Sequence, residues 1–252
     1  MSNKSEIVEY MRSDIVRERF ADALGAERNA APYITSVLLA VANSDKLQEC
    51  SYQSIYTSAL RAATLRLSCD HYAGQAYLVP YGKNATLIVG YKGLYDLAIR
   101  TGRYRYINVG KVYEGENVEE DRITGVISIN GNRTSKKVTG LIASFQMISG
   151  YSKTIHMSVE EIHEHAVKYS KGYNRSDSAW KTNTEAMERK TILRRLISQW
   201  GYIDPADAPL VSQDEVEEYE LEEAPEITET IEGEIVEHEP IDAEESLRQL
   251  GF

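Results

Sequence analysis

The chain has 252 residues, a formal net charge of −11 and only two cysteines, Cys50 and Cys69. The cysteines are not spaced like metal ligands, so they give no support to a disulfide scaffold or a zinc module and fit a reducing compartment. No apolar run approaches the roughly 20 residues of a membrane helix, and the N-terminal segment lacks the apolar stretch of a signal peptide. We therefore expect a soluble cytoplasmic protein.

Charge divides the chain into two regions. Residues 1–203 hold 27 Lys and Arg against 21 Asp and Glu, whereas residues 204–252 hold one Arg against 18 Asp and Glu. A mildly basic body with a polyanionic tail is common in proteins that handle another polyanion, although a solubilising tail explains the same pattern. We predict a folded domain over residues 1–203 and an acidic tail over residues 204–252, which is disordered because a Glu- and Pro-rich segment buries too little apolar surface.

The end of the tail offers a second interpretation. Leu247, Leu250 and Phe252 follow the long acidic segment. That arrangement is typical of a short linear motif that binds a partner's groove, and a frayed terminus is the equally simple alternative.

Periodicity in the first hundred residues changes from helical to strand-like. Apolar spacing predicts helices over 6–24, 33–42 and 52–67. Short β-rich runs over 75–80 and 85–90 flank Tyr81-Gly82-Lys83-Asn84, which predicts a hairpin, and a further helix is expected over 94–101.

The second half of the body alternates strands and helices. Strands are expected over 105–114, 125–130, 137–148 and 153–157, with residues 131–136 as a basic hairpin tip. Ser158 and Glu161 form a capping box that starts a helix reaching Tyr169, and a helix over 178–200 is expected to end at Gly201. The fold class is therefore α+β: a small antiparallel, meandering β-sheet packed with helices, behind an N-terminal helical lobe.

Three clusters of residues have the chemistry of a polyanion site. On the 94–101 helix, Lys92, Asp96, Arg100 and Arg103 oppose the apolar face, and Gly90 and Gly93 would let a ligand approach the backbone; a solvated helix face is the alternative. Eight of the 17 tyrosines fall between Tyr72 and Tyr113 among interleaved Lys and Arg. Such a mixture suits single-stranded nucleic acid, although most of these tyrosines are expected to be strand formers.

The third cluster is on the last helix. Asn183, Lys190 and Arg194 share a stripe beside Trp180 and Met187, and Arg189 and Arg195 add to the positive charge. Clustered cations beside a Trp repel one another, so a polyanionic ligand is the favoured interpretation.

Three ordered blocks resemble the RecT family of phage single-strand annealing proteins, over about residues 14–203. The blocks are Ala62-Ala63-Thr64-Leu65 leading to Gly74-Gln75-Ala76-Tyr77-Leu78-Val79-Pro80-Tyr81; Gly90-Tyr91-Lys92-Gly93 with Leu97-Ala98 and Arg100-Thr101-Gly102; and Trp180 to Gly201, including Lys190-Thr191-Ile192-Leu193-Arg194.

The resemblance implies binding of single-stranded DNA, assembly into rings or helical filaments, and ATP-independent annealing without covalent catalysis, in a bacterial host cell. It also implies a cognate exonuclease as partner, with a host replication protein as the alternative partner of the tail. No cofactor is expected, since the chain lacks a Gly-x4-Gly-Lys-Ser/Thr loop.

The DNA-binding residues that we expect are Tyr91, Lys92, Arg100, Arg103, Lys111, Arg133, Lys136, Lys137, Trp180, Lys190, Arg194 and Arg195, with Tyr91 and Trp180 stacking or lining the groove. The N-terminal helix is a candidate contact between subunits, and the 131–136 tip is expected to reach a strand or a neighbouring subunit.

Rival functions have weaker support. Asp177 with Glu188-Arg189-Lys190 is a loose nuclease-like pattern, but its residues fall on a helix and its cap. A metal site from His156, His163 and His165 is similarly weak, because His163 and His165 lie two apart on a helix and point about 200° apart, so they cannot chelate one ion. A passive single-strand protector remains open, because only the resemblance favours an annealing protein.

Overall fold

The computed structural model describes residues 3–170, 173–176 and 178–208. Its helices are Asn3–Met11 (α1), Asp14–Leu24 (α2), Glu27–Ala42 (α3), Asp45–Gln48 (α4), Tyr52–Thr64 (α5), Tyr91–Arg100 (α6), Val159–Tyr169 (α7), Ala179–Thr182 (α8) and Thr184–Trp200 (α9). Its strands are Ala76–Tyr81 (β1), Asn84–Val89 (β2), Tyr104–Tyr113 (β3), Glu116–Glu120 (β4), Ile127–Gly131 (β5), Val138–Met147 (β6) and Ser152–Ser158 (β7). The predicted α+β class is confirmed, whereas the predicted tail lies outside the described residues from residue 209 onward. Within the described ranges, no helix combines the length and apolar composition that crossing a bilayer requires.

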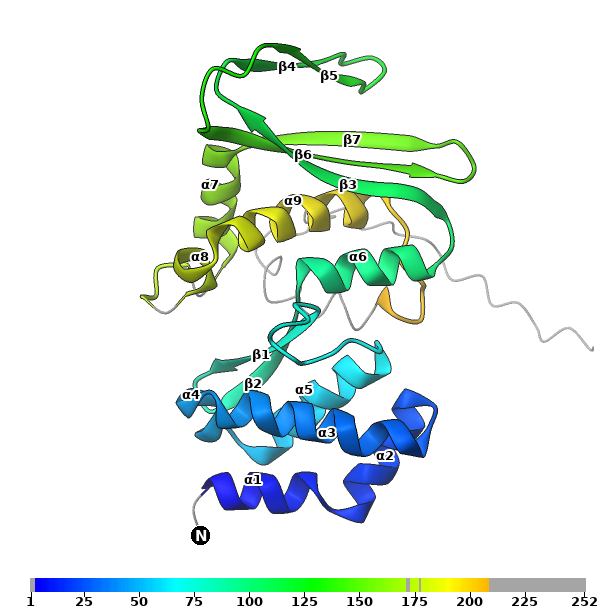
Figure 1. Ribbon diagram of the computed structural model, residues 1–252, viewed down its shortest axis with the longest axis vertical. Coiled ribbons are helices and arrows are strands. Elements are labelled where there is room, and N and C mark those ends of the chain that lie inside the picture. Colours follow the sequence, from blue (N-terminus) through cyan, green and yellow to red (C-terminus); the bar gives the residue numbers. More distant parts are fainter. Residues whose placement is uncertain (1–2, 171–172, 177, 209–252) are drawn as a thin grey trace, which may run out of the picture. The chain divides into compact units, whose positions relative to one another are not determined.

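Helices α1 to α5 pack together and α5 lies against the β1–β2 hairpin (Figure 1). The ring of Phe20 is 5.6 Å from Tyr33 and 6.1 Å from Tyr56, centroid to centroid, so aromatic contacts join three of these helices. The predicted β1–β2 hairpin is confirmed, with Tyr81 opposite Asn84 and Gly82 at a φ of 59°.

The single helix predicted over residues 6–24 is wrong, because the chain breaks between α1 and α2. Ser13 is extended at φ −62° and ψ 150°, and its hydroxyl donates to the carbonyl oxygen of Tyr10 at 2.8 Å. The break lets both helices bury apolar residues, including Ile7 and Phe20, while Ile15 is exposed. The apolar residues of this segment are therefore largely buried inside the lobe, and its contact between subunits stays a prediction.

Three other helix boundaries differ from prediction. Helix α3 begins at Glu27 rather than Tyr33 and contains Pro32. Helix α5 ends at Thr64, and Arg66 just beyond it has a φ of 54° in the left-handed region, which ends the helix. Helix α6 begins at Tyr91, three residues before the predicted start.

The larger sheet has the antiparallel order β3-β6-β7. The buried residues Leu141, Ala143 and Phe145 alternate along β6 with less buried ones, as expected for a strand with one face on a core. Helix α9 packs on β6 and β7, and it also contacts α6 and α7. Figure 1 shows α9 running along this sheet.

The basic hairpin tip predicted at residues 131–136 is wrong. Strand β5 pairs with β4, a strand that was not predicted, while β6 pairs with β3 and β7. Residues 132–137 therefore connect two separate sheets. Figure 1 draws β4 and β5 as a ribbon of their own.

Of the predictions for the C-terminal helices, the start of α7 is confirmed and the single helix over residues 178–200 is wrong. The capping box is present: the amide of Glu161 donates to Ser158 Oγ at 3.1 Å, and the amide of Ser158 donates to Glu161 Oε2 at 2.7 Å. The helix predicted over residues 178–200 is interrupted at Asn183, with φ −149° and ψ 58°. Gly201 ends α9 as predicted, but with an extended φ of −86°. Packing explains this glycine, because an added Cβ would lie 2.8 Å from Tyr104 Oη.

Candidate functional site

A small cationic pocket lies between α7 and α9. We call it the α7–α9 pocket, and its lining residues are His165, Ala166, Ser170, Trp180, Met187, Lys190, Thr191, Arg194 and Arg195. The capping box starts α7 and thereby fixes its lining residues opposite α9. The structure thus brings together Trp180, Lys190, Arg194 and Arg195, which the sequence placed in one cluster.

The size of this pocket limits what it can bind. Its interior volume is about 20 Å³, which is room for about one water molecule. A single phosphate oxygen fits such a volume, whereas a nucleobase does not.

Two lining residues of the α7–α9 pocket are nearly inaccessible. Trp180 is 6% exposed and Arg194 is 7% exposed. The indole ring packs at 5.6 Å from both His163 and Tyr173, centroid to centroid, so little of its face is left for a base. The buried indole Nε1 has no acceptor within the described part of the chain, and a buried unpaired donor costs about 1–3 kcal/mol.

The cations of the pocket affect the pKa of His165. Burial lowers the pKa of His165 below its ordinary value of 6.5, and the charges of Arg195, Arg194 and Lys168 lower it further. These cations disfavour another positive charge among them and would be stabilised by an anion. Sequence reasoning missed His165 as a pocket residue, because its partners come from another helix.

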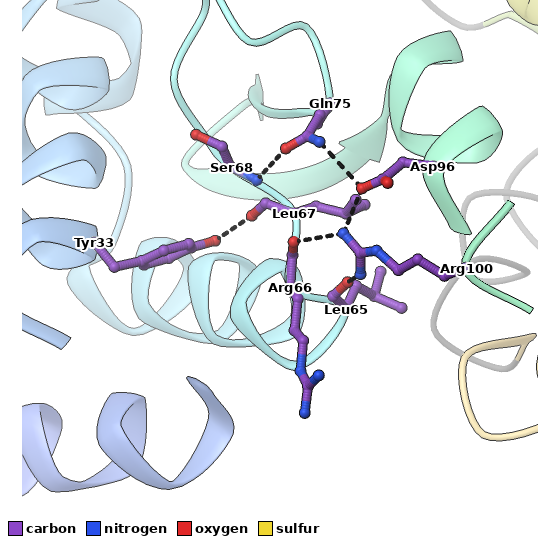
Figure 2. A network of polar contacts seen from close by, with 8 residues as sticks. All are labelled: Tyr33, Leu65, Arg66, Leu67, Ser68, Gln75, Asp96 and Arg100. Atoms are coloured by element: carbon purple, nitrogen blue, oxygen red, sulfur yellow. Dashed lines mark hydrogen bonds and ion pairs between the residues drawn. The ribbon is translucent and has the colours of Figure 1, made fainter. Parts of the chain in front are cut away.

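A second polar network surrounds α6, and we call it the α6 clamp: Gln75, Asp96 and Arg100 with the carbonyl groups of Leu65 and Arg66 (Figure 2). The Arg100 guanidinium donates to Leu65 O at 2.7 Å and to Arg66 O at 2.9 Å, and it also pairs with Asp96. Gln75 Nε2 donates to Asp96 Oδ2 at 3.1 Å. Arg100 therefore joins α6 to the end of α5, and its predicted phosphate contact stays a prediction.

The clamp continues toward α3. The amide of Ser68 donates to Gln75 Oε1 at 2.9 Å, and the hydroxyl of Tyr33 donates to Leu67 O at 2.8 Å. Figure 2 shows these side chains converging on residues 65–68 from both sides. The turn after α5 is thus held by side chains from α3, α6 and the loop before β1.

Gly90 and Gly93 serve packing rather than the predicted close approach of a ligand. An added Cβ at Gly90 would lie 2.4 Å from Gly74 O, and one at Gly93 would lie 2.2 Å from Gln75 O. Both contacts are shorter than atoms tolerate, so the two glycines let the start of α6 lie against the loop before β1.

The other predicted site residues near α6 remain at the surface or partly so. Tyr91 is half-buried against the core, and Lys92 is exposed. Arg103 is exposed, and its guanidinium carbon lies 3.7 Å from the centroid of the Tyr202 ring, a cation–π contact.

The predicted cations of the sheet region have protein partners or lie apart from the α7–α9 pocket lining. Lys111 Nζ is 2.9 Å from Glu185 Oε2 on α9. Arg133 stacks 3.7 Å from the Tyr113 ring centroid, and Lys137 Nζ is 3.8 Å from Glu114 Oε1. Lys136 is exposed in the connection between β5 and β6.

The structure gives little support to the nuclease-like and metal sites considered as rivals. His163 contacts the Tyr173 hydroxyl at 2.8 Å and Glu188 Oε1 at 3.1 Å, whereas His165 lines the pocket. Among residues that the structure describes, no three His, Cys, Asp or Glu side chains gather as metal ligands. Asp177 of the nuclease-like pattern lies outside the described residues.

Comparison with known proteins agrees with the resemblance noted in the sequence. The sequence model of the RecT family matches residues 32–230. The chain is 35% identical over 238 residues to an uncharacterised Bacillus subtilis (strain 168) protein, YqaK, covering 94% of this chain and 80% of that protein. It is 27% identical over 202 residues to Protein RecT of Escherichia coli (strain K12), covering 76% of this chain and 74% of that protein. The family match spans both the α6 clamp and the α7–α9 pocket, and it confirms the predicted family.

Proposed function

Because the chain belongs to the RecT family, we propose that it binds single-stranded DNA and promotes ATP-independent annealing of complementary strands. The proposed setting is phage-type homologous recombination in the cytoplasm of a bacterial host. The protein works by binding and alignment, without covalent catalysis.

The observation that carries the proposal is the α7–α9 pocket. Lys190, Arg194 and Arg195 converge there with His165, whose pKa is lowered by burial and by the surrounding cations. An oxyanion relieves the repulsion among these groups, and a charge-assisted hydrogen bond from Arg to phosphate is among the stronger ones available to a protein. The pocket therefore suits a phosphate oxygen of the DNA backbone, which is the part of DNA that every sequence shares.

Backbone binding of this kind suits annealing. A strand held by its phosphates keeps its base edges available, so a second strand can pair with it, and Watson–Crick pairing supplies the selectivity. We assign phosphate contacts to Lys190 and Arg195, with Lys92 and Arg103 as further candidates on the α6 side; Arg194, which is 7% exposed, adds positive charge behind them. In this proposal Arg100, Lys111 and Trp180 act through their contacts within the protein, with Leu65, Glu185 and Tyr173 respectively.

Assembly and partners extend the proposal. Family membership supports an oligomer, either a ring or a helical filament, that aligns many nucleotides of one strand. Lys136, which is exposed, and its neighbours Arg133 and Lys137 are candidates for a strand or an adjacent subunit. The acidic tail is the proposed contact for a cognate exonuclease or a host replication protein.

The test is the salt dependence of single-strand binding. Each phosphate contact contributes about 0.7 to the slope of log affinity against log salt for single strands. Lys190→Ala and Arg195→Ala should each weaken binding of a labelled oligothymidylate and reduce that slope by about 0.7, as measured by fluorescence anisotropy. Arg28→Ala, which removes an exposed charge at the start of α3, is the matched control and should leave both quantities unchanged. Unchanged slopes in both pocket variants would contradict the assignment.

A further inference from the structure

A second hollow lies in the N-terminal half of the protein and has a different chemistry. Its volume is about 480 Å³, and it lies between helices α3 and α4 on one side and residues 69–72 with strand β1 on the other. Its lining includes Leu39, Asn43, Ser44, His71, Tyr72 and Tyr77. We call it the aromatic hollow. It exceeds the volume of a nucleobase, unlike the α7–α9 pocket.

Tyr72 is the unusual residue of this hollow, because 91% of its surface is exposed. Local hydrogen bonds hold the backbone that carries it: the amide of Tyr72 donates to Asp70 Oδ1 at 2.9 Å, and the amide of Asp70 donates to Ser68 Oγ at 3.1 Å. Because the Tyr72 ring is so exposed, burial of its apolar surface contributes little to the stability of the fold. The turn holds the ring in solvent, where a ligand can contact it.

The three rings of the hollow form two edge-to-face pairs that share His71. The ring of His71 lies 6.1 Å from Tyr72 and 5.8 Å from Tyr77, centroid to centroid, at interplanar angles of 78° and 71°. Edge-to-face pairs of this kind do not stack the rings face to face. Asn43 and Ser44 supply hydrogen-bonding groups on the opposite wall, of the kind that base edges use.

Tyr77 connects the aromatic hollow with the residue that precedes α6. An added Cβ at Gly90 would lie 2.9 Å from Tyr77 Cε2, so the Tyr77 ring lies over the residue that precedes α6. An added Cβ at Gly74 would lie 3.4 Å from Tyr77 Oη and 3.2 Å from Lys92 Cδ, so the Lys92 side chain passes close to the same ring. The exposed Lys92 side chain and the Tyr77 hydroxyl thus both lie beside Gly74.

We propose that the aromatic hollow receives a nucleobase of the bound single strand, stacked on Tyr72, while Lys92 neutralises a neighbouring phosphate. This inference rests on the proposed function, since it requires a single strand on the protein. A ring face, a nearby cation and polar groups at the base edge form the combination that binds single strands with little sequence preference. The hollow therefore contacts a base whatever its identity, in contrast to the α7–α9 pocket, which is suited to phosphate alone.

The test separates base contacts from phosphate contacts by comparing oligothymidylate with an abasic oligonucleotide of equal length and charge. Stacking of one base on an aromatic ring changes affinity by roughly 5- to 150-fold. The wild-type protein should therefore bind oligothymidylate more tightly than the abasic strand by a factor within that range. Tyr72→Ala should lower affinity for oligothymidylate by about 10-fold and leave affinity for the abasic strand and the salt slope unchanged. Tyr72→Phe, which keeps the ring, should restore the preference for bases.

Tyr106→Ala is the matched control, since Tyr106 is an exposed tyrosine on β3 that does not line the hollow, and it should keep the wild-type preference. The inference is overturned if Tyr72→Ala leaves the preference for bases unchanged. A change of self-association in sedimentation velocity with an unchanged base preference would instead assign Tyr72 to a contact between subunits. Either result leaves the proposed function standing. A wild-type protein that binds neither oligonucleotide would instead contradict the proposed function itself.

Discussion

Arg100 donates a hydrogen bond to the carbonyl oxygen of Leu65, 2.7 Å away, and so joins helix α6 to the end of helix α5. The last carbonyl groups of a helix lack partners within it, and a cation at this end is also favoured by the helix dipole. A residue that the sequence suggested as a DNA contact therefore holds two parts of the fold together.

Replacement of Arg100 should reveal this structural role through stability. Arg100→Ala should lower the free energy of unfolding by about 1–2 kcal/mol, since it removes charge-assisted hydrogen bonds that are partly exposed. Arg100→Lys should lose most of the same stability, because one ammonium group cannot span both carbonyl groups and Asp96. Urea denaturation measures both variants, with Arg105→Ala on the exposed side of β3 as control. Full stability in Arg100→Lys would show that charge alone matters at this position.

Gly93→Ala should destabilise the protein through a direct clash. Its new Cβ would lie 2.2 Å from Gln75 O, so α6 must shift from the loop before β1, at a cost of roughly 1–3 kcal/mol. Gly110→Ala is the matched control, because nothing lies within 4 Å of its added Cβ. Thermal unfolding should separate the two variants, and equal melting temperatures would contradict the packing assigned to Gly93.

Acidification should destabilise the protein through His165 and His156. Burial lowers the pKa of both side chains below 6.5; nearby cations lower that of His165 further, whereas Glu161 and Glu120 partly oppose the shift at His156. The unfolded chain therefore takes up protons first as the pH falls. Stability should be fully present above pH 6.5 and should decrease below it as the folded-state pKa values are approached.

The pH effect can be assigned to His165 by removing its titrating group. His165→Gln should flatten the decrease in unfolding free energy between about pH 6.5 and pH 5, measured by urea denaturation at several pH values. A decrease of unchanged steepness would place the effect on other groups, and a rise in stability on acidification would contradict the burial of both histidines.

Lys111 should behave differently from Lys190 in DNA binding. Its ammonium group lies 2.9 Å from Glu185 Oε2, and this contact is the leading cause that lowers the pKa of Glu185. Lys111→Ala should cost at most about 1 kcal/mol of stability and leave the salt slope of single-strand binding unchanged. A loss of slope equal to that of Lys190→Ala would place Lys111 on the phosphate path after all.

Local features of the fold were predictable because their signals lie within a few residues. Ser158 and Glu161 define both ends of a capping box, and Gly82 provides the left-handed residue of the β1–β2 turn. The breaks at Ser13 and Asn183 were missed because the apolar pattern continues across both. In each case tertiary packing determines the direction of the next helix.

Long-range features were not predictable from the same signals. Strand β4 is rich in Glu and contains Asn, residues that strands disfavour, and it forms only because β5 pairs with it. The roles of Arg100 and Lys111 depend on groups supplied by distant elements, so an exposed cation and a clamped cation look alike in sequence. Lys190, Arg194 and Arg195 were grouped because helical spacing places them on neighbouring turns of α9, whereas Trp180 joins them because α8 packs against α9.

The most direct test of the account is the annealing of two labelled complementary oligonucleotides, with and without the protein and with and without ATP. We predict annealing faster than the spontaneous rate, equally fast without nucleotide, and lost in Lys190→Glu and Arg195→Glu but retained in Arg28→Glu. Binding of single strands without any acceleration would reduce the protein to a passive protector, and no binding at all would contradict the central claim.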